Sequence, residues 1–249
     1  MNLTKDQELV CGINVVNAII SIRPGSVKTL FIEDNKRGRI QELGQLAKKN
    51  NIEVVLQNTS FCQNNFSEMN HQGAAIICHK RLEENESFLE SIIEKDNLLL
   101  LILEHITDPH NVGACIRSAA AAGVDAVIVP KNRSCHLTPT VRKISSGGAE
   151  LIPFIVVTNI VRTINKLQSA GVIVYGTDMK ASKFHNEVTY GNKSVLIIGS
   201  EDKGLKRLTV ENCDEIIKVK MPGRIESLNA SVSAGIMLFQ MINQQSTTG

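Results

Sequence analysis

The sequence predicts an α/β protein in which a parallel sheet is covered by helices on both faces. In the second half of the chain, apolar runs of four to six residues alternate with segments of helical periodicity. A strand that is apolar throughout is buried on both faces, as the strands of parallel sheets are. The 249 residues suit two modest domains better than one core, and 43% hydrophobic residues are enough to fill both.

The expected elements follow in chain order. In the first 80 residues we expect a strand at Lys28–Glu33, a helix at Arg39–Lys49 and strands at Ile52–Leu56 and Ala74–His79. After residue 97 we expect strands at Leu98–Leu103, Ala126–Val129, Phe154–Val157, Val172–Tyr175, Val195–Ile198 and Ile216–Val219. Helices are expected among them at Pro109–Ala122, Thr138–Ser146, Asn159–Ser169 and Leu228–Ile242.

A polar stretch separates the two groups of elements and has no clean strand pattern. We therefore expect an N-terminal domain over residues 1–80, an acidic linker over 81–97 and a C-terminal domain over 98–249. The first domain holds nine Lys and Arg against seven Asp and Glu, the linker two against six, and the second domain sixteen against twelve. This charge distribution permits RNA as a partner without requiring it. Nine aromatic residues with no Trp argue against base stacking as the main mode of recognition.

Several classes of protein do not fit. The longest strictly apolar run, Leu98–Leu103, is too short to span a membrane, and Met1–Lys5 does not resemble the start of a signal peptide. The six cysteines form no C-x-x-C pair, so we expect reduced cysteines in a cytoplasmic protein. Neither G-x-G-x-x-G nor G-x-x-x-x-G-K-[ST] is present, and no cluster of His and Cys indicates a metal site.

Three of the expected strands end in short segments that contain glycine. These are V-Y-G-T-D at residues 174–178, I-I-G-S-E at 197–201 and V-K-M-P-G at 219–223. Ligands of parallel sheets gather at the carboxyl ends of strands, and glycine lets a ligand approach the backbone closely. The three strand exits therefore predict one pocket.

One charged residue stands on the helix expected after Leu98–Leu103. Asp108 is placed to cap this helix and Pro109 to open it, and Arg117 carries its single charge between residues 112 and 122. We expect so uncharged a helix to be buried nearly all round, and a buried guanidinium needs a carboxylate or a phosphate. A functional role for Arg117 is favoured over a structural ion pair, with Glu201 as its expected partner.

The final helix is expected to have Ser227 as its N-cap. Apolar residues follow at helical spacing, at Leu228, Val232, Ile236 and Phe239. Capping and packing do not explain Asn229, a poor helix former just inside the expected helix. Small residues on this helix would let another helix approach closely; they are Ser231, Ala234 and Gly235.

Three motifs then occur in an order typical of the SpoU (TrmH-like) branch of the SPOUT methyltransferases. They are N-x-G-x-x-x-R-S-A at Asn111–Ala119, G-S-E at Gly199–Glu201 and S-L-N-A-S-V-S-A-G at Ser227–Gly235. The N-terminal segments C-G-I-N-V-V-N-A at residues 11–18 and H-Q-G-A at 71–74 resemble the substrate-binding domain of family members that 2′-O-methylate a guanosine in the P-loop of 23S rRNA. The resemblance covers nearly the whole chain. It departs at Asp202, where glycine is usual, and at Lys220-Met-Pro222, which replaces Pro-Met-x before Gly223.

The resemblance implies a C-terminal SPOUT domain with a trefoil knot and a small L30e-like N-terminal α/β domain that binds RNA. It also implies a homodimer in which each pocket borrows residues from its partner. We expect the segment Leu228–Ile242 in the dimer interface, with its small residues at the contact. The implied reaction transfers a methyl group from S-adenosylmethionine to a ribose 2′-hydroxyl of RNA, without a metal.

The family's roles pass to the matching positions of this chain. Arg117 would direct the hydroxyl and the neighbouring phosphate, Asn111 and Glu201 would hold Arg117, and Ser227 and Asn229 would shape the acceptor side. The cofactor would lie against Thr177, Gly199, Val219, Met221 and Leu228. A guanidinium hardly deprotonates in proteins, so we favour orientation and charge stabilisation by Arg117 and leave the identity of the base open.

Four cations follow the strand at Ala126–Val129 and are expected to track the RNA backbone beside the pocket; they are Lys131, Arg133, Arg142 and Lys143. Two alternatives stay open at this point. The substrate could be a tRNA, against which the N-terminal domain argues. The chain could also be a knotted RNA-binding protein that has lost catalysis, which Asp202 would support. Neither DNA nor a membrane is an expected partner.

Overall fold

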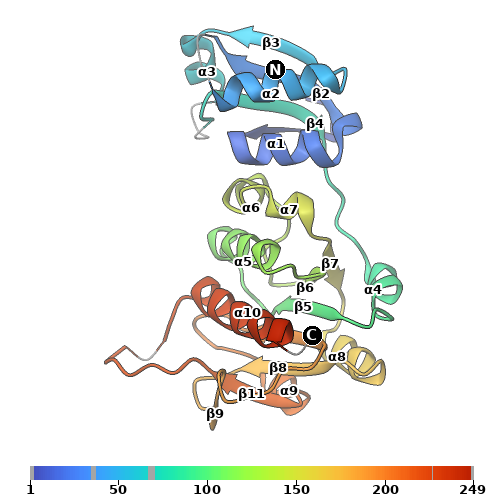
Figure 1. The fold of residues 1–249 in the computed structure, drawn as a ribbon, viewed down its shortest axis with the longest axis vertical. Helices are drawn as coiled ribbons and strands as arrows, with labels where there is room; N and C mark the ends of the chain where they lie inside the picture. The colour runs from blue at the N-terminus through green and yellow to red at the C-terminus, as the bar shows by residue number, and fades with distance from the viewer. Residues whose placement is uncertain (1–2, 35–37, 67–70, 226, 248–249) are drawn as a thin grey trace. The chain divides into compact units, whose positions relative to one another are not determined.

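The computed structural model of the protein describes residues 3–34, 38–66, 71–225 and 227–247. Its contacts divide the chain into two compact units. One unit contains Met1–Leu82 together with Arg142–Leu151, and the other contains Glu83–Val141 together with Ile152–Gly249 (Figure 1). The segment Arg142–Leu151 thus packs with the N-terminal residues, although it lies inside the range expected for the C-terminal domain.

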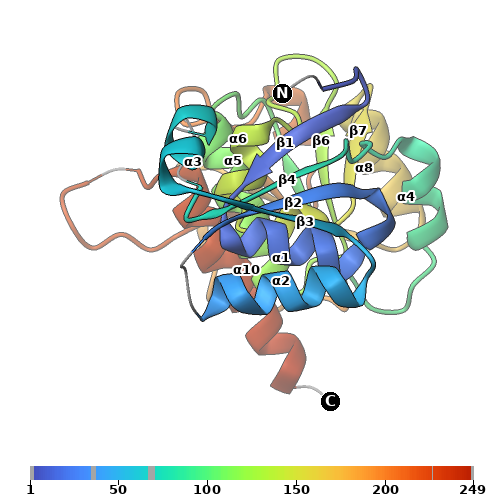
Figure 2. The ribbon, with the colours of Figure 1, turned by 90° about the horizontal axis from the view of Figure 1, so that it is seen from above.

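The first unit is built on a four-stranded mixed sheet in the order β1-β4-β2-β3. The strands are β1 (Gln7–Cys11), β2 (Val27–Glu33), β3 (Glu53–Gln57) and β4 (Ala74–His79), and the helices are α1 (Ile13–Ile22), α2 (Arg39–Lys49) and α3 (Thr59–Phe66), with a 3₁₀ turn η1 at Pro24–Ser26. Figure 2 shows α1 and α2 along one side of this sheet. The predicted strands and the helix at Arg39–Lys49 are confirmed, whereas β1, α1 and α3 were not predicted.

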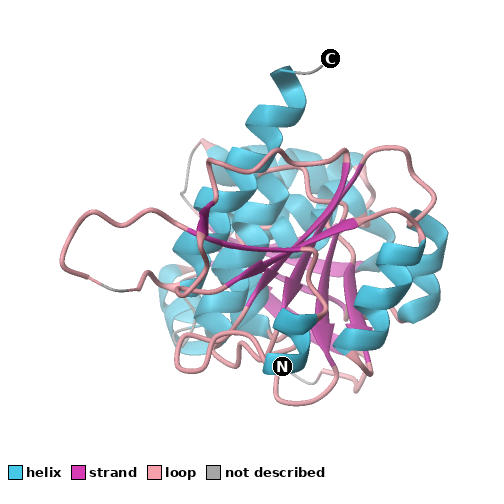
Figure 3. Cartoon of the chain, turned by 90° about the horizontal axis from the view of Figure 1, so that it is seen from below, coloured by secondary structure: helices cyan, strands magenta, loops and turns pink. Residues whose placement is uncertain are grey.

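The second unit contains a seven-stranded sheet in the order β7-β6-β5-β10-β8-β11-β9, and every pair in it is parallel, as predicted. Its strands are β5 (Leu98–Leu103), β6 (Ala126–Pro130), β7 (Phe154–Val157), β8 (Ile173–Thr177), β9 (Lys183–Phe184), β10 (Lys193–Ile198) and β11 (Glu215–Lys218). Its helices are α4 (Glu86–Ile92), α5 (Pro109–Ala121), α8 (Ile160–Ser169), α9 (Arg207–Glu211) and α10 (Ala230–Thr247). Helices lie on both sides of the sheet (Figure 3).

The helix expected at Thr138–Ser146 is shorter, as α6 (Pro139–Ile144), and is followed by α7 (Gly148–Leu151).

The central strand β5 shows why an apolar run predicts this layering. All six of its residues are buried. Its alternate residues Leu98, Leu100 and Ile102 belong to one core cluster with side chains of α4 and α8. Successive strand residues point to opposite faces, so Leu99, Leu101 and Leu103 fill the other face, on which α10 packs against α5.

The expected acidic linker contains a helix, α4, capped by Asn85, whose side chain accepts a hydrogen bond from the Ser87 amide at 2.9 Å. Leu89 and Ile92 of α4 are buried. Part of the polar stretch between the two groups of strands is therefore packed structure.

The trefoil knot stays a prediction, because a strand order does not by itself define a knot. In the described ranges, no helix combines the length and apolarity needed to cross a membrane.

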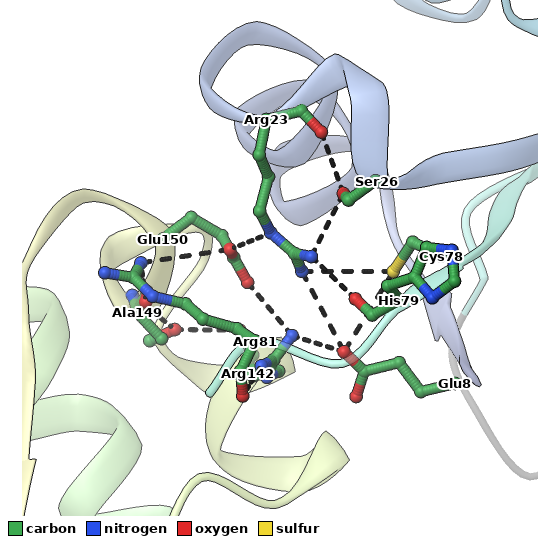
Figure 4. A network of polar contacts seen from close by, with 10 residues as sticks. Glu8, Arg23, Ser26, Cys78, His79, Arg81, Arg142, Ala149 and Glu150 are labelled. Atoms are coloured by element: carbon green, nitrogen blue, oxygen red, sulfur yellow. Dashed lines mark hydrogen bonds and ion pairs between the residues drawn. The ribbon is translucent and has the colours of Figure 1, made fainter. Parts of the chain in front are cut away.

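The segment Arg142–Leu151 is anchored in the first unit by a buried ion network (Figure 4). The Arg142 guanidinium contacts the carboxylates of Glu8 and Glu150, and the side chains of Arg142 and Glu150 are 1% and 0% exposed. Arg23 Nε donates to Glu150 Oε2 at 2.8 Å, and Arg81 lies 3.8 Å from the same oxygen. The expectation that Arg142 contacts RNA is therefore wrong, because its charge is satisfied by two carboxylates away from solvent.

Candidate functional site

A cavity of about 290 Å³ opens at the carboxyl ends of β8, β10 and β11, where three strand exits predicted a pocket. The start of α10 closes part of its wall. All five residues expected to bind the cofactor line it: Thr177, Gly199, Val219, Met221 and Leu228. Two of the residues expected to act in catalysis, Glu201 and Ser227, line it as well. Apolar side chains such as Ile198 and Met237 complete the lining, so the cavity combines an apolar surface with exposed backbone at strand ends.

The loop after β10 folds back on itself at the cavity wall. The Gly204 amide donates to the Ser200 carbonyl at 2.8 Å, and Gly204 has φ +62°. A Cβ atom on Gly199 would lie 2.3 Å from the Gly204 carbonyl carbon, so only glycine fits at position 199. Among the described residues of this loop, the left-handed conformation belongs to Gly204 and not to Asp202. The departure from the family pattern at Asp202 therefore imposes no backbone strain.

We predict that Gly199→Ala weakens binding of the expected cofactor, S-adenosylmethionine, by about tenfold or more, since the backbone of the 199–204 loop must move to admit the alanine methyl group. Titration calorimetry measures this affinity, and circular dichroism checks that the fold is kept. Gly223→Ala is the matched control, because a Cβ there meets nothing within 4 Å. Equal affinities in the two variants would show that this loop does not shape the cofactor site.

Asn111, Glu201 and Asn229 form one hydrogen-bonded cluster, although they come from three distant parts of the chain. Glu201 Oε1 accepts from Asn111 Nδ2 at 3.1 Å, from Asn229 Nδ2 at 2.6 Å and from the Ala230 amide at 3.2 Å. Asn229 Nδ2 also donates to Asn111 Oδ1 at 2.8 Å. The Glu201 carboxylate thereby ties the first turn of α5 to the N-terminus of α10, where the helix dipole favours a negative charge.

Asn229, rather than Ser227, caps α10. The helix begins at Ala230, and Asn229 Oδ1 accepts hydrogen bonds from the Ser231 amide at 3.0 Å and from the Ser231 hydroxyl at 2.6 Å. The expectation for Ser227 was wrong because both residue types cap helices well, and the helix starts three residues later than Ser227. Ser227 instead is exposed at the cavity wall.

Arg117 is exposed, contrary to the prediction of a helix buried nearly all round. The predicted N-cap is confirmed, because Asp108 accepts from the His110 amide at 2.9 Å. The buried side of α5 carries Cys115, Ile116 and Ala119. Among the described residues, Arg117 makes no hydrogen bond or ion pair, so its expected pairing with Glu201 is absent from this chain. Its guanidinium remains available to an anionic ligand or to another subunit.

The remaining expected RNA contacts divide between the two units. Lys131 and Arg133 are exposed after β6, in the unit that holds the cavity, and β6 ends at the same edge of the sheet as β10. Lys143 is half-buried and belongs with Arg142 to the other unit. Lys131 and Arg133 therefore remain candidates beside the cavity.

Glu104 is a functional candidate that the sequence reasoning missed. It follows β5, is 2% exposed, and accepts from the Lys206 amide at 2.9 Å and from Thr209 Oγ1 at 2.7 Å. These bonds fasten the start of α9, where the Gly199–Lys206 loop ends. A charged residue directly after six apolar ones was the available signal, because a carboxylate at that place must be satisfied inside the protein.

The chemistry of the site is polar rather than nucleophilic. Burial raises the pKa of Cys115, the cysteine of α5, to about 12, so its thiol stays protonated at neutral pH. Among the residues described, no three or more His, Cys, Asp or Glu side chains group as metal ligands would. Amides and a carboxylate beside a cavity can hold and orient a bound ligand.

The chain is similar to known proteins along nearly its whole length. A family model described as "SpoU rRNA Methylase family" matches residues 98–239, and one described as "RNA 2'-O ribose methyltransferase substrate binding" matches residues 9–83. The chain is 40% identical to the 23S rRNA (guanosine-2'-O-)-methyltransferase RlmB of Coxiella burnetii over 239 residues, which is 95% of each chain. It is also 40% identical to the RlmB of Pseudomonas aeruginosa, covering 96% of this chain and 97% of that one.

Solved structures share the fold. The SpoU methyltransferase AviRb from Streptomyces viridochromogenes, in complex with the cofactor AdoMet, superposes with a TM-score of 0.79 and 20% sequence identity. The superposition covers 97% of this chain and 92% of AviRb. Both units of the chain thus have counterparts in one known architecture.

Proposed function

The chain belongs to the SpoU rRNA methylase family, and from this premise we propose that it transfers the methyl group of S-adenosylmethionine to the 2′-oxygen of a guanosine ribose in 23S rRNA. The observation that carries the proposal is the cavity at the three strand exits, with the Asn111–Glu201–Asn229 cluster at its edge. The N-terminal unit matches the substrate-binding family and favours rRNA over the tRNA alternative.

The lining of the cavity suits the chemistry of the donor. S-adenosylmethionine supplies an electrophilic methyl group on a sulfonium. Val219, Leu228 and Met221 provide an apolar surface for an adenine ring, and the strand ends at Thr177 and Gly199 bring backbone polar groups to its edge. Ligand sites at the carboxyl edge of a parallel sheet use these features.

The chain's own residues would position the acceptor. Arg117 is free of intramolecular partners among the described residues, so it can hold the ribose hydroxyl and the adjacent phosphate in line with the methyl group. A guanidinium hardly deprotonates, so its role is orientation and charge stabilisation. Glu201 accepts three hydrogen bonds on one oxygen and therefore positions Asn111 and Asn229.

A direct test combines binding with mapping of the product. Calorimetry should detect S-adenosylmethionine binding, and tritium transfer from labelled donor should occur onto 23S rRNA and not onto tRNA. Mapping 2′-O-methyl groups in total RNA with and without the gene would identify the nucleotide. Donor binding without transfer to rRNA or tRNA would favour the inactive RNA-binding alternative. Because rRNA is the proposed substrate, the proposed place of action is the cytoplasm.

We also propose a homodimer that uses α10, through a different face from the one expected. Two of the three small residues pack within the chain: Ala234 is fully buried, and a Cβ on Gly235 would lie 3.5 Å from Ser118 Oγ of α5. The exposed face carries Val232, Ile236 and Phe239, which are 47%, 37% and 43% exposed. Their spacing places them on one side of the helix. A second copy covering this stripe could receive the exposed Arg117 of its partner.

We predict that the double variant Ile236→Glu/Phe239→Glu is monomeric at micromolar concentration, because burying two carboxylates in an apolar contact is unfavourable. Light scattering gives the mass. Leu208→Glu on α9 is the control, since Leu208 is 54% exposed outside the proposed interface. A wild-type protein that is itself monomeric would contradict the proposal.

A further inference from the structure

Two lysines share one aromatic ring at the edge of the seven-stranded sheet. Lys218, the last residue of β11, is the register partner of Phe184 in β9. The Nζ atoms of Lys218 and Lys220 lie 5.3 Å and 5.6 Å from the centroid of the Phe184 ring. We call these three residues the lysine cluster. The two lysines are two positions apart in an extended segment, so their side chains leave it on the same side.

The lysine cluster carries positive charge that no described carboxylate neutralises. Neither Lys218 nor Lys220 makes an ion pair or a hydrogen bond with a described side chain, whereas the adjacent Lys183 donates to both carboxylate oxygens of Glu215 at 2.8 Å. Two ammonium groups near one ring repel each other, and the ring attracts each of them only weakly. An arrangement of this kind is stabilised when an anion binds between the two charges.

The place of the lysine cluster indicates which anion it meets. Lys218 lines the cavity, and its neighbours Val219 and Met221 line it as well, so the segment that carries both lysines forms part of the cavity wall. Lys180 and Lys203 lie on the same cavity wall and also lack an ion-pair partner among the described residues. The lysine cluster therefore lies next to the proposed site of methyl transfer, where the proposed substrate is a polyanion. Lys220 is also the residue that replaces the family's usual proline.

We propose that Lys218 and Lys220 bind the phosphate backbone of the substrate RNA next to the methylated nucleotide, and that Phe184 holds their ammonium groups in place. The proposal rests on the proposed function for the substrate class and adds a contact surface to it. Two charges held on a ring lose less freedom on binding than two solvated lysines, so the ring pre-organises the contact.

The test is the double variant Lys218→Gln/Lys220→Gln, with binding of a labelled single-stranded 23S rRNA fragment measured by fluorescence anisotropy at several salt concentrations. Each lost phosphate contact removes about 0.7 from the log–log salt slope, so we expect the slope to fall by about 1.4 and affinity to fall about tenfold at 0.1 M salt. KM for RNA should rise, and the affinity for S-adenosylmethionine should not fall.

The matched control is Lys95→Gln/Lys166→Gln. It makes the same change in net charge within the same unit, but these lysines are exposed and paired with Asp125 and Glu90. Phe184→Leu should weaken RNA binding while keeping the wild-type salt slope, because both charges remain. Lys220→Gln alone changes an exposed residue outside any strand and serves if the double variant does not fold.

Three outcomes would overturn the proposal. The first is a double variant with wild-type affinity and slope, and the second is a control variant with an equal loss. The third is a lower affinity for S-adenosylmethionine, which would assign the lysines to the donor's carboxylate. The proposed function alone would be refuted if the double variant lost RNA affinity as expected while the wild-type enzyme transferred no methyl group.

Discussion

Arg117→Ala is expected to lower kcat for methyl transfer by about 10²–10³-fold, the usual effect of removing one group that stabilises developing charge in a transition state. Arg117 is exposed and has no partner among the described residues of its own chain, so its removal leaves the fold and the donor cavity intact. Single-turnover transfer of a tritiated methyl group to 23S rRNA measures the effect. Calorimetry should show unchanged affinity for S-adenosylmethionine.

Arg117→Lys should lower kcat nearly as much as Arg117→Ala, because a point charge does not reproduce the planar fork of donors. Arg207→Ala is the control, since Arg207 is exposed on α9 and, among the described residues, forms an ion pair with Glu211 alone. Comparable activity of Arg117→Ala and wild type would remove Arg117 from the mechanism.

Mixing two impaired variants, at a donor concentration too low to saturate Gly199→Ala, tests whether Arg117 serves its partner's pocket. A heterodimer of Arg117→Ala and Gly199→Ala subunits contains one intact site only if the arginine acts across the interface. Random mixing should then restore about a quarter of wild-type activity. No recovery, in a sample shown to contain heterodimers, would place Arg117 and the cavity of one chain in the same site.

Glu150→Ala is expected to destabilise the first unit by about 3–5 kcal/mol, the usual cost of breaking a buried ion pair. Its carboxylate is fully buried and contacts Arg23, Arg81 and Arg142. The Glu8 carboxylate would remain against the guanidinium groups of Arg23 and Arg142, and burial already raises the pKa of Glu8 above its usual value. Hydrogen exchange read out by mass spectrometry resolves peptides of this unit and reports the loss where it occurs.

The matched control for this prediction is Glu211→Ala, which breaks the exposed Arg207–Glu211 pair and should cost less than about 1 kcal/mol. Glu150→Gln keeps the volume of the side chain, so its loss of stability should lie between those of Glu150→Ala and Glu211→Ala. If Glu150→Ala were no less stable than Glu211→Ala, the network would not be what holds Arg142–Leu151 in the first unit.

The local pattern of apolar residues was sufficient to predict most strands of the sheet in the second unit. The run Leu98–Leu103 predicted β5 with its observed bounds, because six consecutive apolar residues are stable only when both faces are covered. The same reasoning missed α1. Ile13–Ile22 is rich in β-branched residues, which favour strands, but its polar residues Asn14, Asn17 and Ser21 stand at helical spacing and are exposed.

The pocket was predictable for a related reason. Carboxyl ends of parallel strands meet at one edge, so Thr177, Gly199 and Val219 had to converge once the strands were correct. The motifs placed Asn111, Glu201 and Asn229 in one site, and the structure shows their hydrogen bonds. Which of two good capping residues starts α10 was not predictable, because that choice depends on where Glu201 holds the chain.

The burial of two arginines could not be predicted from the sequence. Arg117, among small and apolar neighbours, was expected to be buried and is exposed, whereas Arg142, expected on the surface, is 1% exposed. The sequence by itself determined the parallel sheet, the position of the pocket and the family motifs, because these follow from periodicity and from residues close in the chain. Tertiary structure decided which guanidinium is buried. Desolvating that charge is tolerated only where carboxylates converge on it, and Glu8 is 134 residues away from Arg142.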